Sequence, residues 1–228
     1  LCEDLYGVGI HKEGFRIFDY CGNFEFFRTN KNGKEAKMMK SLTENLFNIR
    51  IGIIKELQIL DYQTDEYTQH RHSLIEGILK EIKGIDESKF SARMKLQFIH
   101  KFNQESAFEC LSDADVRELE DHVAPLLLAI DDDELAKRFD YLMFTIEFAD
   151  LKRVPASKPK NRVVSTAEKL TFKGTIEKIK QQEALIYKVQ TNEYWEEADI
   201  FDHEEVREAL RDLIKFLDST SGENYYTN

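Results

Sequence analysis

A capping box followed by a long apolar stripe is the feature that most constrains this fold. Ser41 and Glu44 stand three residues apart, so their side chains can satisfy the free backbone amides at a helix start. Apolar residues then recur at helical spacing as far as Leu60 and spread beyond one face. The stretch predicts a helix that is largely buried.

Further stretches of the same kind follow along the chain. They predict helices over residues 66–83, ending at Gly84, over 88–103, from Ser112 to near Pro125, and over about 131–151. The helix over 88–103 carries four large apolar side chains that need cover, namely Phe90, Met94, Ile99 and Phe102. A succession of amphipathic helices of this length indicates a bundle.

A basic loop with Pro155 and Pro159 interrupts the pattern after Leu151 and is the best internal boundary. Beyond it the spacing predicts a long helix over 162–190, bent at Gly174, and a last helix over 203–217 with Asp202 as its N-cap. The predicted fold class is therefore mainly α, a multi-helix bundle with a small β remnant at its N-terminus.

That remnant lies in residues 15–27. Residues 15–20 alternate apolar and polar side chains, and Cys21-Gly22-Asn23 turns the chain into a short helix with three phenylalanines. A lone strand leaves its backbone hydrogen-bonding groups unpaired, so its sheet is expected elsewhere. We therefore expect a chain cut from a larger protein, which agrees with a first residue, Leu1, that is not Met.

Segments near both ends carry a family resemblance. LCEDLYG (1–7), FRIFDYCGNFEFF (15–27) and SLTENLFNIRIGIIKELQ (41–58) resemble the motor (R) subunit of type I restriction enzymes just after its last helicase motif. Tyr194-Trp195 and VREALRDLIKFLD (206–218) resemble the close of the C-terminal region in the EcoEI-like branch of that family. The acidic middle, residues 61–151, adds little to this resemblance.

The resemblance implies a docking region that is not catalytic by itself. In that family a nuclease domain and two motor domains, which use ATP and Mg²⁺, precede this region, and the methyltransferase and specificity subunits are its partners. Residues 1–40 would be the tail of a motor domain with a connector, 41–151 an acidic helical bundle, and 152–228 the basic linker and last helices of the same helical domain. The region would hold no cofactor, and alone it would bind DNA weakly or not at all.

Composition permits a core and offers no membrane segment. Hydrophobic residues make up 42% of the 228 residues, but no run of about 18 apolar residues and no signal-peptide pattern occurs. We expect a cytoplasmic protein. Three widely spaced cysteines, Cys2, Cys21 and Cys110, match neither a disulfide framework nor a zinc pattern.

The formal net charge of -11 is unevenly spread. Residues 152–192 hold 10 Lys and Arg against 3 Asp and Glu, whereas residues 61–151 hold 10 against 21. We favour the interpretation that the basic side chains complement acidic helices of this chain or of a neighbouring domain. The alternative is a nucleic-acid-binding module through residues 152–188. In both cases the candidate contact residues are Lys152, Arg153, Lys158, Lys160 and Arg162.

A small metal-dependent nuclease is the alternative from the enzyme class. Such a site needs an Asp at a strand end and a Glu-x-Lys on the next strand, and Asp19, Glu35 and Lys37 have a tolerable spacing. Glu35 stands in a polar, turn-rich stretch, however, where no apolar strand would fix its carboxylate. The idea requires a strand at Glu35 paired with residues 15–20.

Three further features have simple structural explanations. His70 and His72 are two apart on a helix, so we expect surface histidines on different faces and no metal pair. The acidic run over 131–134 fits a helix N-terminus better than a calcium loop. Trp195, the only tryptophan, either closes the core or anchors a partner, and we favour core closure.

Overall fold

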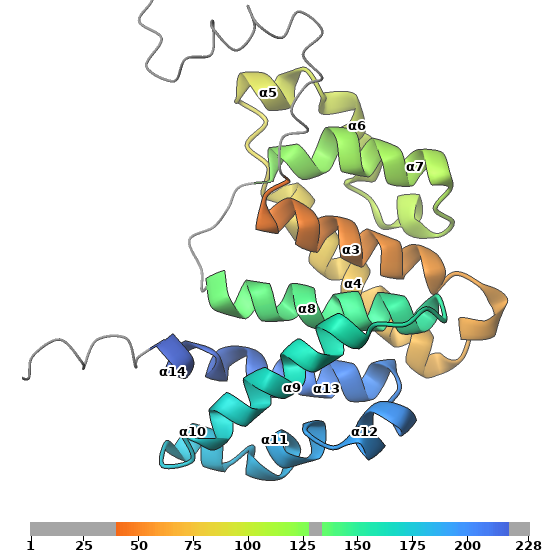
Figure 1. Ribbon diagram of the computed structural model, residues 1–228. Coiled ribbons are helices and arrows are strands. Elements are labelled where there is room, and N and C mark those ends of the chain that lie inside the picture. The colour runs from red at the N-terminus through yellow and green to blue at the C-terminus, as the bar shows by residue number, and fades with distance from the viewer. Residues whose placement is uncertain (1–39, 128–133, 219–228) are drawn as a thin grey trace, which may run out of the picture. The chain divides into compact units, whose positions relative to one another are not determined.

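The computed structural model describes residues 40–127 and 134–218, which belong to one compact unit that begins at Lys40. Within these ranges the chain is mainly α, because helices and short helical turns follow one another without a strand (Figure 1). The predicted multi-helix fold class is confirmed. The strand predicted over residues 15–20, and Asp19, Glu35 and Lys37, lie outside the described residues.

The α-helices of this unit vary widely in length. Their bounds are α3 Leu42–Glu56, α4 Asp65–Lys83, α5 Phe90–Arg93, α6 Leu96–Phe102, α7 Asp113–Glu118, α8 Glu134–Leu151, α9 Ser157–Thr171, α10 Glu177–Lys180, α11 Glu183–Val189, α12 Asn192–Glu197, α13 Ile200–Leu210 and α14 Lys215–Asp218. Short 3-10 turns occur at Leu60–Tyr62, Glu105–Phe108, Ala124–Leu126 and Arg211–Leu213, and one π-helical turn at Leu119–Val123.

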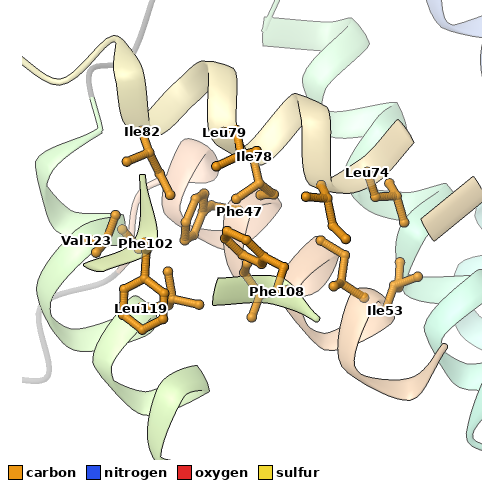
Figure 2. Close-up of a cluster of buried hydrophobic side chains, with 14 of the residues drawn as sticks. Phe47, Ile53, Leu74, Ile78, Leu79, Ile82, Phe102, Phe108, Leu119 and Val123 are labelled. Atoms are coloured by element: carbon orange, nitrogen blue, oxygen red, sulfur yellow. The ribbon is translucent and has the colours of Figure 1, made fainter. Parts of the chain in front are cut away.

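Buried side chains form two clusters. The first gathers α3, α4, α6 and the α7 region, and Figure 2 shows Phe47 and Phe108 at its centre between the isoleucines of α4 and Phe102 of α6. The second gathers α9, α11, α12 and α13, with Val163, Ala167 and Val206 fully buried. Burial of this much apolar surface is the main source of stability for both halves.

Helix α8 belongs to both clusters. Its Phe144 and Leu151 pack into the first cluster, whereas Phe139, Met143 and Ile146 pack into the second. In Figure 1, α8 accordingly lies between α3 on one side and α13 on the other, and all three contacts of α8, with α3, α9 and α13, are extensive. A helix covered on opposite sides needs apolar residues on more than one face, and the apolar residues of α8 are distributed in this way.

The local start and stop signals identified several helix ends correctly. The Ser41 hydroxyl accepts a hydrogen bond from the Glu44 amide (3.1 Å), Gly84 caps α4, and Ser112 forms a capping box with Asp115. Helix α8 ends at Leu151 as expected. Each of these signals acts within four residues, so distant packing does not override it.

The long helix predicted over 162–190 is wrong. Helix α9 begins at Ser157, with Pro159 in its first turn where the missing amide costs little, and ends at Thr171. The chain then turns, and α11 packs back on α9, where the Gln190 amide donates to the Thr171 hydroxyl (2.9 Å). A continuous helix would have carried Ile179, Ile186 and Val189 away from the second cluster, in which they are now buried.

Two other predicted elements differ in detail. The helix expected over 88–103 is split into α5 and α6, and Phe90 and Met94 are not covered but 80% and 69% exposed. The helix predicted over 203–217 is divided into α13, the 3-10 turn Arg211–Leu213 and α14. Helix α13 begins at Ile200, because Asp199 is the N-cap and Asp202 is its partner in a capping box. In addition, none of the described helices is long and apolar enough to cross a membrane.

The close approach of α3 and α8 rests on a glycine, which gives a testable prediction. A Cβ on Gly52 would lie 3.0 Å from the Phe148 ring, whereas one on Gly77 of α4 would meet its nearest neighbour, the Arg50 guanidinium, at 3.6 Å. We expect Gly52→Val to lower the free energy of unfolding in urea by about 1–3 kcal/mol through overpacking. The control Gly77→Ala should raise it by about 0.5–1 kcal/mol through helix propensity. Equal effects of the two changes would contradict this account of the α3–α8 contact.

Candidate functional site

The described charged side chains that lie deepest are those of α8 and their partners. Asp140, Glu147 and Asp150 lie on α8, and Asp140 and Glu147 are only 7% and 1% exposed. A carboxylate at such depth is costly unless it is paired and hydrogen-bonded. Each of the three has a partner from a distant part of the chain.

Glu147 pairs with His70 of α4. The His70 Nε2 and the Glu147 carboxylate are 2.6 Å apart, and the two side chains are 9% and 2% exposed. Burial opposes charge on the His70 ring, but the hydrogen bond and the attraction of Glu147 outweigh it, so the pKa of His70 is raised. Burial also raises the pKa of Glu147, although its bond to His70 acts in the opposite direction. The expectation of a surface histidine at position 70 is therefore wrong, whereas His72 is exposed beside Glu76 and Glu105.

Asp150 pairs with His203 of α13 and Lys160 of α9. The His203 Nε2 is 2.8 Å from the Asp150 carboxylate, and the Lys160 ammonium is 3.3 Å from it. On the other side of the ring, the Nδ1 lies 3.3 Å from the Tyr194 hydroxyl, which also donates to the Asp202 carbonyl (3.2 Å). Burial raises the pKa of Asp150, but His203 and Lys160 outweigh it, so the pKa is lowered overall. Burial raises the pKa of Tyr194.

Asp140 accepts from two arginines of the α13 region. The Arg207 guanidinium lies 3.0 Å from one carboxylate oxygen, and Arg211 reaches both oxygens at 3.0–3.3 Å. Arg207 also makes a two-bond pair with Glu204 (2.5 and 2.6 Å). Burial opposes the charge of Arg207, but Glu204 and Asp140 outweigh it and raise its pKa.

This set of pairs is suited to holding helices together. Glu147 pairs with α4, Asp150 with α9 and α13, and Asp140 with α13, so α8 is bonded to three helices by charged contacts. An Asp–His–Tyr series can move a proton in principle, but His203 and Tyr194 are only 1% and 4% exposed. Of the residues in these buried pairs, His70 lines a hollow of about 590 Å³ between α4 and α13. The other lining residues include Glu66, Asp199, Asp202 and Glu205. In the described part of the chain, no group of three or more His, Cys, Asp or Glu is arranged to hold a metal ion.

The structure separates the five predicted contact residues into two groups. Lys152 pairs with Glu56 (3.1 Å), Arg153 with Asp61 (3.1 Å) and Lys160 with Asp150, so three of them contact acidic residues of this unit. Lys158 and Arg162 are exposed on α9, and no ion pair with a described carboxylate includes them. The two groups can therefore serve different roles.

Trp195 lies on α12 and joins the second cluster. Its indole N–H donates to the Val189 carbonyl (2.9 Å), its ring is tilted against His203 at 5.7 Å, and the Lys160 ammonium lies over it at 5.6 Å. The ring is half-buried, so one edge stays open to solvent. It packs in this unit as core closure requires, and its role as a partner anchor stays a prediction.

Sequence reasoning missed the acids of α8 and their histidine and arginine partners. One signal was available, because Asp140 and Glu147 are seven residues apart and so share a face of the helix with the apolar Phe144 and Leu151. The acidic run at 131–133 lies outside the described residues, and Glu134 makes an exposed pair with Arg138 (2.6 Å).

Comparison with known proteins adds no relative, since no family model, no curated protein and no solved structure matches this chain.

The raised pKa of His70 predicts a pH-dependent contribution to stability. The folded state holds this proton to higher pH than the unfolded chain, so the contribution is complete below pH 6.5 and is lost as the pH rises through the folded pKa. We expect His70→Gln to lower the free energy of unfolding by about 1 kcal/mol at pH 6, because an uncharged amide donor replaces a protonated imidazole. At pH 9, where the imidazole is already uncharged, the change should have little effect. The matched control is His72→Gln, whose exposed ring should give a small effect at both values. An equal loss at pH 6 and pH 9 for His70→Gln would refute the assignment.

Two ion pairs of α8, those of Asp140 and Glu134, test whether burial or a short distance decides how much an ion pair contributes to stability. Asp140 is buried between arginines at 3.0 Å, whereas Glu134 has a shorter contact with Arg138 (2.6 Å) in which both side chains are more than 60% exposed. We expect Asp140→Ala to cost about 2–3 kcal/mol, below the full cost of a broken buried pair because Arg211 is partly exposed. Glu134→Ala should cost less than about 0.5 kcal/mol. Urea unfolding at pH 7 measures both, and a larger cost at Glu134 would contradict this ranking.

Proposed function

We propose that this chain is a docking region, the C-terminal helical part of a type I restriction motor subunit. It would attach the ATP-driven motor and nuclease to the methyltransferase and specificity subunits, without catalysing a reaction itself. The proposal is supported by the resemblance of segments 1–7, 15–27, 41–58 and 206–218, and by a mainly α fold, which that resemblance implies.

The observation that carries the docking role is the exposed apolar pair on α5. The Met94 amide donates to the Phe90 carbonyl (3.3 Å), so the two side chains leave one helical turn on the same side. They are 69% and 80% exposed, while Ala92 on the opposite side is 1% exposed and fixes the turn to the first cluster. A large aromatic and a methionine displayed together on a supported turn are typical anchors for another polypeptide.

The experiment measures binding of this chain to a purified type I methyltransferase–specificity complex from the same source by biolayer interferometry. We expect the double change Phe90→Ala and Met94→Ala to weaken binding about tenfold or more, because truncating central anchors costs at least 2 kcal/mol. Phe172→Ala is the matched control, since Phe172 is an equally exposed aromatic (86%) on a different helix end, and binding should stay unchanged.

Two results would overturn this proposal. One is the absence of any binding between the chain and the complex at micromolar concentration. The other is catalysis by the chain alone, either hydrolysis of ATP or cleavage of DNA with Mg²⁺, since a docking region has no such activity.

A further inference from the structure

Helix α9 has a solvent face made of cations and hydrogen-bond donors. Lys158, Arg162 and Lys169 are exposed and lie within about 40° of one another around the helix axis, opposite the buried Val163, Ala167 and Leu170. Asn161 and Ser165, also exposed, lie beside them, on the side toward the exposed Glu168. We name the three cations with Asn161 and Ser165 the cationic face of α9, which is about 16 Å long. That length corresponds to the axial rise of roughly five base pairs.

Among the residues that the structure describes, the three cations have no acidic partner. The described ion pairs of the basic segment belong to Lys152, Arg153, Lys160 and Lys188, and none involves the cationic face. Some other exposed cations are paired, as in Arg138 with Glu134 and Lys101 with Asp115 and Glu118, whereas Lys83, Lys89 and Arg93 are exposed and in no described ion pair. The interpretation that the basic residues complement acids of the same chain therefore accounts for Lys152, Arg153 and Lys160 but not for this face.

This arrangement is unfavourable for the helix itself. Lys158 and Arg162 are four residues apart, where like charges destabilise a helix, and they occupy its first turns, where the helix dipole repels cations. Among the described helices of eight or more residues, α9 alone has no acidic residue in its first turn. A local rule broken without a compensating contact in the folded chain indicates that another molecule provides the compensation.

We propose that the cationic face of α9 binds the phosphate backbone of duplex nucleic acid. Its members are donors of the types that contact phosphate, and none of the five is apolar. A protein partner needs an apolar core within the contact, whereas a nucleic-acid interface is polar and positively charged. Base stacking contributes little, because the first exposed aromatic, Phe172, lies only at the far end. The inference does not rest on the docking role, since it uses a different helix and a different partner.

The test measures binding of residues 1–228 to a fluorescently labelled 20-base-pair DNA duplex by anisotropy over a range of salt concentrations. Three phosphate contacts predict a slope of log K against log salt of about -2.7. The triple change Lys158→Gln, Arg162→Gln and Lys169→Gln should weaken binding at least tenfold at about 20 mM salt and bring the slope close to zero. Because it removes like-charge repulsion, the variant should melt at the same temperature as the parent chain or higher, which separates lost binding from lost folding.

The matched control is Lys83→Gln, Arg93→Gln and Lys89→Gln, which removes the same charge from another exposed set of cations. It should leave both affinity and slope nearly unchanged. The proposal is overturned if the parent chain does not bind duplex at low salt, or if both triple variants lose affinity equally. It is also overturned if the single strand binds more tightly than the duplex, or if polyglutamate competes as well as DNA at equal charge, since the face would then serve an acidic polypeptide.

Discussion

The need to neutralise buried carboxylates on α8 is the constraint on which the rest of this structure depends. Asp140 and Glu147 are shut off from solvent and Asp150 is largely so, and bases reach them from α4, α9 and α13. Their histidine and arginine partners are 53 to 77 residues away in the chain, whereas Lys160 is 10 residues from Asp150. Apolar burial brings the helices together, and these charged contacts then select one rotation and register for each helix around α8.

The cations of the basic segment, residues 152–192, fall into two groups according to whether they contact other parts of this unit. Cations that point toward α8 or the α3–α4 connection are used inside the unit, whereas those on the outer face of α9 are not. The segment that the composition marked as one basic run thus has an inner structural side and an outer side open to a partner. The exposed pair Phe90 and Met94 presents a second, chemically different surface on α5.

Sequence reasoning succeeded where the determinant is local and failed where it is distant. Ser41, Gly84 and Ser112 set helix ends through contacts within four residues, and they could be identified without the fold. The return of α11 onto α9 could not, because helical periodicity continues through Gly174 and the turn is fixed by contacts such as Gln190 with Thr171. Periodicity also shows which side Phe90 faces but not whether anything covers it. The acids of α8 were missed because pairing is decided by residues far along the chain.

The membership of α8 in both hydrophobic clusters has a consequence for how this unit loses its structure. Removing either cluster would expose one side of α8 and leave its carboxylates without bases, so neither half can melt while the other persists. The basic connection after Leu151 is therefore a boundary in sequence only. Heat or denaturant should unfold the helices before and after this connection in a single cooperative transition. The backbone amides of α8 should be the last to exchange with solvent.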